Sequence, residues 1–294
     1  MASNWTGKKP VDKREENVNV LDLLSWTVQP PLGIIKGEYF REENYFAPHF
    51  PGDPGYHGIL EVVRRDGVLV HVEFNEYVAP SYYMRLYQNA SKRRGSFCFY
   101  QATKARTAQT LVVLNNGICS VEQQMLAQNR LTGDFDLVSG ASNSVKRSLL
   151  PLANKIDAAM KLPVTKKYYG YAEKLGNGIT ARLQVVLDGF KIMNCFYDEI
   201  FADTMEEIEE KELKKYYRQS KYFCLEYESA YSDGFNTLFD LLNKKVVLTQ
   251  DLVDLKGLPW TKDTDKRAHN PEWDNYLRLA TILKVEMAND GIRL

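Results

Sequence analysis

One short segment combines small residues with a hydroxyl that could meet an anionic group. Residues 136 to 142 read Asp-Leu-Val-Ser-Gly-Ala-Ser. Gly140 and Ala141 leave room beside the backbone, because glycine tolerates close approach and unusual dihedral angles. An amphipathic pattern follows, and the free N–H groups at the start of a helix stabilise anions. The segment therefore predicts an anion beside the hydroxyl of Ser142, although a polar turn capped by Ser142 would use the same residues.

The element that follows decides whether a helix dipole acts on Ser142. Apolar residues recur at spacings of three or four, as on one face of a helix: Val145, Leu149, Leu152, Ala153, Ile156 and Met160. Pro151 interrupts this pattern and leaves two alternatives. If the helix begins at Ser142 or Ser144 and kinks at Pro151, Ser142 lies at its positive end. If the helix begins at Ser148, Ser142 lies in the preceding loop and the dipole acts on it less.

The segment resembles the flavin-attachment motif of FMN-binding domains, a family that includes the C subunit of the sodium-translocating NADH:quinone oxidoreductase. The family pattern is an Asp, a few small residues, Ser/Thr-Gly-Ala, and then the Thr or Ser that carries FMN through a phosphoester. The resemblance implies that Ser142 carries the flavin and that Ala141 keeps room for its phosphate. It also implies that Ser139 and Gly140 shape the turn, and that Asp136 fixes the loop or is read by the loading enzyme.

Two hairpins predict antiparallel sheet in both halves of the chain. Asp66-Gly67 and Asp188-Gly189 each lie between alternating apolar runs, which is typical of a two-residue hairpin turn. One face of each hairpin is expected to be apolar: Val68, Val70, Val72 and Phe74 in the first, and Leu183, Val185 and Leu187 in the second.

Paired features recur at a nearly constant offset, which indicates internal duplication. The two Asp-Gly pairs lie 122 residues apart, Asn75-Glu76 and Asp198-Glu199 lie 123 apart, and Phe97-Cys98 and Phe223-Cys224 lie 126 apart. The second half has no Ser-Gly-Ala-Ser sequence after its Asp251-Leu252-Val253, so we expect it to hold no flavin.

We therefore predict an α+β protein with two tandem units, each an antiparallel sheet with packed helices. The expected parts are an N-terminal arm over residues 1–34, an FMN-binding unit over 35–162 and a degenerate second unit over 163–294.

Composition argues against several classes of function. Lys and Arg number 38, as do Asp and Glu, and no segment concentrates positive charge, so nucleic-acid binding is not expected. No run of 18 apolar residues occurs, so no transmembrane segment is expected. The N-terminus lacks the basic segment and apolar core of an export signal. A cytoplasmic location is therefore expected, unless a leader has been removed.

Other chemically notable side chains are dispersed. The cysteines lack Cys-x-x-Cys spacing and lie in apolar runs, so buried thiols are expected rather than a zinc or iron–sulfur site: Cys98, Cys119, Cys195 and Cys224. If a ring lies over Ser142, its expected neighbours are Tyr82, Tyr83, Tyr87 and Tyr100. Thr204-x-x-Glu207 forms a capping box that predicts a solvated helix over residues 204–217.

These features and the resemblance predict an FMN-binding electron-transfer protein. A separate flavin transferase would attach FMN at Ser142, and redox donor and acceptor proteins would exchange electrons with it. Because the flavin supplies the redox chemistry, the chain itself need not be an enzyme. One alternative is a flavin-dependent reductase with non-covalent FMN, which would require a substrate pocket with acid–base groups. The other is a degenerate scaffold protein that retains the fold without flavin.

Overall fold

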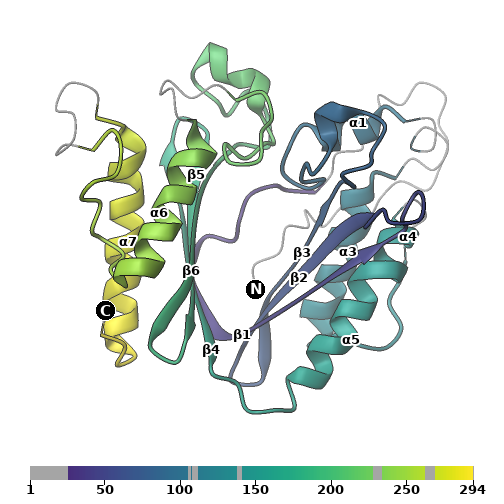
Figure 1. Ribbon diagram of the computed structural model, residues 1–294, viewed down its shortest axis with the longest axis horizontal. Coiled ribbons are helices and arrows are strands. Elements are labelled where there is room, and N and C mark those ends of the chain that lie inside the picture. The colour runs from purple at the N-terminus through teal and green to yellow at the C-terminus, as the bar shows by residue number, and fades with distance from the viewer. Residues whose placement is uncertain are drawn as a thin grey trace. The chain divides into compact units, whose positions relative to one another are not determined.

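The protein is α+β, as predicted, with six antiparallel strands and helices packed on them (Figure 1). The computed structural model describes residues 26–104, 107, 112–137, 141–227, 234–261 and 269–293, except for the side chain of Ser142. The strands are β1 (Gly33–Phe46), β2 (Tyr56–Arg65), β3 (Val68–Tyr77), β4 (Lys166–Gly176), β5 (Ile179–Asp188) and β6 (Lys191–Phe201). The α-helices are α1 (Phe97–Ala102), α3 (Leu114–Gln128), α4 (Ser142–Ser144), α5 (Leu150–Ala159), α6 (Phe235–Thr249) and α7 (Pro271–Asn289).

The strand order is β3-β2-β1-β4-β5-β6, and the chain divides into two compact units. Most of the first unit is Phe40–Val164, and most of the second is Thr165–Tyr222 with Glu226–Leu294. Strand β1 contributes to both, because its first residues pair with β4 in the second unit while the residues from Phe40 onward belong to the first. This strand begins at Gly33, within the segment expected to be an N-terminal arm.

The core of the first unit lies between β2, β3 and the helices α3 and α5. Leu60 and Phe74 from the strands pack with Met125 from α3 and with Leu152 and Ile156 from α5. The apolar helical face predicted after Ser142 is confirmed, since its residues are buried, with Met160 partly so: Val145, Leu149, Leu152, Ala153, Ile156 and Met160.

The core of the second unit lies between β4–β6 and the helices α6 and α7. The predicted alternation in β5 is confirmed, because Leu183, Val185 and Leu187 are fully buried in this core. Trp273 and Tyr276 from α7 pack against the same cluster. Each unit therefore buries one face of its strands under helices, which is how an amphipathic strand is stabilised.

The first predicted hairpin forms, but its alternation differs from the prediction. Asp66-Gly67 connects β2 and β3 with φ angles of 52° and 78°, as type I′ turns require. The pairing shifts at Val70, where β3 has one additional residue opposite β2. A bulge reverses the alternation of side chains, so Leu69 lies in the core with Phe74. The prediction that Val68 and Val70 share the face of Phe74 is wrong.

The second hairpin also forms, with its turn one residue later than predicted. Asp188 pairs with Lys191, so the turn residues are Gly189-Phe190. The φ of 60° at Gly189 suits a turn with glycine at the first central position. Strand β6 has a register shift at Met193, which lies 123 residues after the one at Val70.

The helix after the predicted attachment segment begins at Ser142 and continues through a π turn, η3 (Val145–Leu149), into α5. The alternative start at Ser148 is therefore wrong. Pro151 has no N–H to donate to the carbonyl of Arg147 four residues earlier. Asn44 Nδ2 donates to that carbonyl instead, at 3.0 Å, and Ser148 Oγ donates to Asn44 Oδ1 at 2.5 Å. A contact from β1 thus stabilises the helix where its own ladder is interrupted.

Each unit contains, within itself, a hydrogen bond at a corresponding place between a helix end and a strand. Asn129 and Gln250 follow α3 and α6 in left-handed conformation, with φ angles of 49° and 59°. Asn129 Oδ1 accepts a hydrogen bond from Leu69 N at 2.7 Å, and Gln250 Oε1 accepts one from Ile192 N at 2.6 Å. The tandem duplication itself stays a prediction.

The helix predicted over residues 204–217 is wrong. The segment forms turns and then a 3₁₀ helix, η4 (Lys211–Tyr216). Thr204 Oγ1 donates to Glu207 Oε1 at 2.9 Å instead of capping a backbone N–H. Ile208 and Tyr216 are the buried apolar residues of this segment, and two such residues do not provide the continuous face that stabilises a helix.

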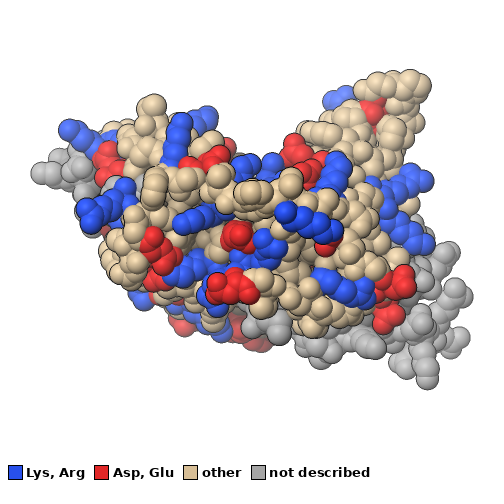
Figure 2. All heavy atoms as spheres, turned by 90° about the horizontal axis from the view of Figure 1, so that it is seen from below, with Lys and Arg blue, Asp and Glu red and all other residues tan. Residues whose placement is uncertain are grey.

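Surface charge is mixed on the face drawn in Figure 2, where Lys and Arg side chains lie among those of Asp and Glu. Among the described helices, none combines the length and the apolar character needed to cross a bilayer.

Candidate functional site

The predicted attachment residue begins a helix whose first turn borders a pocket in the first unit. The Ala141 carbonyl accepts a hydrogen bond from Val145 N at 3.1 Å, so the helical ladder starts here. The N–H groups of the first helical residues have no carbonyl one turn earlier within the helix, which makes this end electropositive. Asn143 and Ser144 line the pocket next to Ser142.

The structure places two of the five predicted site residues in full. Ala141 is buried, with 1% of its surface exposed. The main chain of Asp136 is held by α3, because its N–H donates to Gln124 Oε1 at 2.7 Å and its carbonyl accepts from Gln124 Nε2 at 3.0 Å. A role for the Asp136 carboxylate stays a prediction. The other predicted groups lie outside the described residues: Ser139, Gly140 and the side chain of Ser142.

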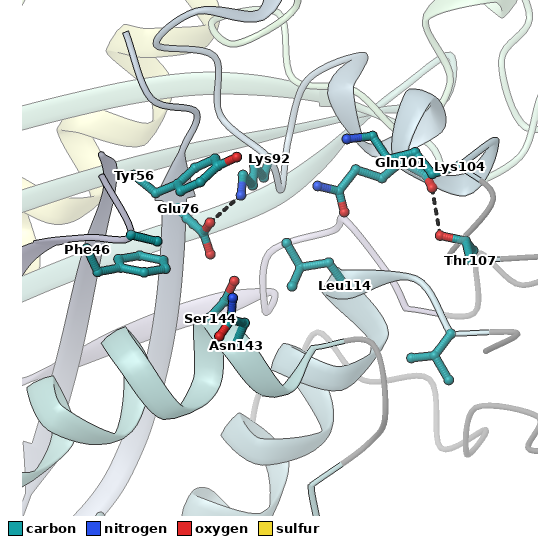
Figure 3. A pocket seen from close by; sticks show the side chains of 12 residues that line it. Phe46, Tyr56, Glu76, Lys92, Gln101, Lys104, Thr107, Leu114, Asn143 and Ser144 are labelled. Atoms are coloured by element: carbon teal, nitrogen blue, oxygen red, sulfur yellow. Dashed lines mark hydrogen bonds and ion pairs between the residues drawn. The ribbon is translucent and has the colours of Figure 1, made fainter. Parts of the chain in front are cut away.

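The pocket has a volume of about 200 Å³. Figure 3 shows Glu76 and Lys92 paired on one wall, while Ser144 and Asn143 face them from the helix start. Small-molecule sites typically measure about 300–1,000 Å³. The cavity therefore has room for part of a nucleotide-sized ligand, and the remainder would extend through its opening.

Two lysines determine the charge of the pocket. Lys92 Nζ donates to Glu76 Oε1 and lies 3.8 Å from the centroid of the Tyr56 ring. Lys104 Nζ donates to the Tyr82 hydroxyl at 2.6 Å, and burial lowers the pKa of this lysine. Glu76 is the one acidic residue among the described residues that line the pocket, so the lining carries one excess positive charge. Together with the helix start, this charge favours an anion.

One buried oxygen in the pocket wall has no hydrogen-bond partner among the described residues. Glu76 is only 2% exposed; its Oε1 accepts from Lys92, but its Oε2 receives no donor. Buried carboxylate oxygens are normally satisfied by donors. A ligand with an O–H or N–H group at this position would supply one.

The four tyrosines expected near a ring do not line the pocket; they lie in an aromatic cluster against which Tyr56 of the pocket wall packs. Tyr82, Tyr87 and Phe97 pack together, and Tyr100 stacks on Tyr87 with ring centroids 5.0 Å apart. Tyr83 is largely exposed and its hydroxyl contacts that of Tyr100, an interaction that lowers the pKa of Tyr83. The cluster reaches the pocket through Lys104, which lies 4.8 Å from the centroid of the Tyr100 ring.

The rings that line the pocket are Phe46 and Tyr56, which were not predicted, and its charged groups were missed as well. Phe46, Tyr56 and Glu76 are distributed over three strands, so no local motif brings them together. A signal existed for the polar groups, because Glu76 lies in one of the repeated dipeptides on which the duplication was predicted.

The predicted thiols are confirmed, since all four cysteines are buried. Burial raises the pKa of Cys119 and of Cys195 to about 12. Within the described part of the chain, no three His, Cys, Asp or Glu side chains are grouped to hold a metal ion.

The pocket lining suits the chemical groups of FMN. The helix start with Lys92 and Lys104 suits a phosphate, the free oxygen of Glu76 suits a hydroxyl or ring N–H, and Phe46 with Tyr56 offers aromatic surface. The arrangement can therefore bind an anionic, polar and aromatic ligand.

No protein-family model matches the sequence. No curated protein matches it either. A crystal structure of the CPE2226 protein from Clostridium perfringens is similar to part of the chain, with 17% sequence identity and a TM-score of 0.32. The similarity covers 43% of this chain and 90% of that one, and at this TM-score it supports no conclusion about function.

Proposed function

We propose that the first unit carries FMN, attached through its phosphate to Ser142, and acts as an electron-transfer protein. The observation that supports this most directly is the position of Ser142. It is the first residue of a helix whose first turn lines a pocket with two lysines. The segment that resembles the attachment motif thus lies where an anion is favoured.

Attachment would exchange one bond of the phosphate for another. The Oγ–H bond of Ser142 breaks, a bond forms between Oγ and phosphorus, and the bond from phosphorus to its leaving group breaks. With FMN as the formal donor the leaving group is hydroxide, which takes the proton and departs as water. The protein therefore gains the mass of FMN less that of water. A separate flavin transferase would perform this step.

The bound flavin supplies the redox chemistry, and the chain positions it. Lys92, Lys104 and the helix start hold the phosphate end, while Phe46 and Tyr56 limit water at one side of the ligand. Redox donor and acceptor proteins would then meet the part of the flavin that the small cavity leaves outside.

We propose further that the two units arose by tandem duplication and that the second holds no flavin. The register shifts at Val70 and Met193 and the helix-ending residues Asn129 and Gln250 support the duplication. The absence of Ser-Gly-Ala-Ser from the second half of the sequence supports the loss of attachment.

The intact mass of the full chain, produced together with a flavin transferase, tests this proposal. We expect the parent to gain one FMN less water and to keep its yellow colour after acid precipitation. Ser142→Ala should abolish both results. Ser120→Ala is the matched control, because it removes a hydroxyl from α3, outside the residues that line the pocket, and should leave the mass gain intact. An unmodified parent, or a Ser142→Ala protein that still gains the mass, would contradict attachment at Ser142.

A further inference from the structure

The second unit contains a buried ionic cluster whose oxygens are all satisfied by its own side chains. Lys221 Nζ donates to Glu199 Oε2 at 2.6 Å and to Glu272 Oε1 at 2.9 Å. Glu199 Oε1 accepts from the Tyr197 hydroxyl at 2.7 Å and from Asn275 Nδ2 at 3.0 Å, and Glu272 Oε2 accepts from Asn270 Nδ2 at 3.2 Å. The lysine and both carboxylates are at most 8% exposed. The cluster is therefore complete without any ligand.

The glutamate and lysine of this cluster correspond to Glu76 and Lys92 in the first unit. In each unit the lysine N–H donates to the carbonyl of the glutamate at 2.8 Å, and the lysine Nζ donates to its carboxylate. The serine before each lysine forms an isolated β-bridge with the residue after the glutamate. Ser91 pairs with Tyr77, and Ser220 pairs with Ile200. The same local arrangement thus occurs twice.

The other members of the cluster differ between the units. Tyr197 lies two residues before Glu199, and Phe74, which has no hydroxyl, lies two residues before Glu76. Glu272 in the first turn of α7 corresponds to Ser144. The pairs Leu152-Ala153 and Leu279-Ala280 align the helices, and the π turn accounts for one additional residue in the first.

The positions at which the two units differ lie in the wall of the pocket or next to it. Where the second unit places the hydroxyl of Tyr197, Glu76 Oε2 receives no donor among the described residues. Where the second unit places the carboxylate of Glu272, the first unit has the short side chain of Ser144 and a cavity. The second unit therefore indicates which groups the cavity of the first can accept.

We infer that the pocket recognises a phosphorylated polyol through two adjacent contacts: a hydroxyl that donates to Glu76 Oε2 and a phosphate that accepts from Lys92 at the helix start. In the second unit Tyr197 and Glu272 replace these two ligand groups, which keeps that unit closed. The inference rests on the proposed function in that the ribityl phosphate of FMN is such a group. It adds Glu76 as the residue that positions the ribityl chain.

The test uses the full chain with Ser142→Ala, so that binding is measured without attachment. FMN, riboflavin and ribose 5-phosphate are titrated into this protein, and binding is followed by calorimetry.

Replacing Glu76 by Gln presents a donor to the ligand hydroxyl, and we expect a loss of about tenfold to a hundredfold in affinity for both FMN and riboflavin. Lys92→Met should weaken FMN and ribose 5-phosphate by a similar factor and leave riboflavin nearly unchanged. Glu42→Gln, at a partly exposed position of β1 outside the pocket lining, is the matched control and should change the affinity for neither flavin.

A second variant distinguishes a loss of ligand binding from a failure of the chain to fold. Phe74→Tyr with Ser144→Glu installs the side chains of the second unit in the first. We expect this double variant to lose FMN binding and to unfold at a higher temperature, because the buried oxygen of Glu76 gains a donor. FMN affinity that is unchanged by Glu76→Gln and by the double variant would overturn the inference, as would a chain that binds neither flavin. Attachment of FMN to the parent alongside either result would leave the proposed function standing.

Discussion

The charge of Lys104 makes anion binding in the pocket depend on pH. Burial lowers the pKa of this lysine below the usual value of about 10.4. A phosphate is attracted by the protonated form only, so the excess positive charge of the pocket disappears as pH rises through the lowered pKa.

We therefore expect the affinity of the Ser142→Ala protein for FMN to fall with rising pH, beginning below pH 10.4, while riboflavin shows a weaker dependence. Titrations across this range measure the effect. Lys104→Met should flatten the FMN profile, whereas Lys155→Met, at an exposed position of α5, should leave it unchanged. Equal pH dependence for FMN and riboflavin would contradict a role for the lysine charge.

The thiols give a second residue-scale prediction. The thiolate is the reactive form of cysteine, and burial raises the pKa of Cys119 and Cys195 to about 12. We expect iodoacetamide at pH 8 to leave all four cysteines of the native chain unmodified and to modify all four in denaturant. Mass spectrometry counts the additions. Rapid alkylation of the native chain at either of these two residues would show that its surroundings open.

At the scale of elements, helix ends hold the hairpins in register. Asn129 ends α3 with φ of 49°, accepts from Leu69 N at 2.7 Å, and donates to the carbonyl of Gly67 at 3.1 Å. A single side chain thus connects a helix end to the bulged strand and to its turn.

Replacing Asn129 by Gly removes both side-chain hydrogen bonds but keeps the left-handed conformation accessible. We expect a loss of about 1–3 kcal/mol in the free energy of unfolding. Asn129→Ala should cost about 1 kcal/mol more, because alanine is unfavourable at positive φ. Urea unfolding measures both, and Gln250→Gly and Gln250→Ala give the matched pair in the second unit. A Gly variant as stable as the parent would show that the cap does not stabilise the hairpin.

For the whole molecule, the central question is whether the two units are equally stabilised by the helices α5 and α7 that end them. Leu152 and Leu279 are both fully buried and occupy corresponding places in α5 and α7. Each substitution by Ala removes the same side-chain atoms from a fully buried position.

We expect Leu152→Ala and Leu279→Ala each to lower the free energy of unfolding by about 2–5 kcal/mol. Denaturant unfolding followed by circular dichroism measures the two losses. When either variant is produced with the flavin transferase and then unfolded, FMN should remain on the chain, because the proposed bond is covalent. A large loss for one leucine and almost none for the other would argue against equivalent units.

Part of the candidate site was predictable from sequence. The segment ending at Ser142 was located because its small residues and the helical pattern after it are adjacent in the chain. Glu76, Lys92 and Lys104 were not located, because they approach the helix start only when β3, the segment after it and the end of α1 pack together. That Glu76 Oε2 has no donor among the described residues is visible only in the folded chain.

The sequence by itself determined the α+β class, the presence of both hairpins, the buried face of the helix after Ser142 and the buried thiols. These features follow from periodicity and turn chemistry, which act between near neighbours in the chain. The tertiary structure alone decided the bulge at Val70, the path of the helix past Pro151 and the pocket. Each of these depends on contacts between distant residues, such as the amide of Asn44 that satisfies the carbonyl of Arg147 in place of the N–H that proline lacks.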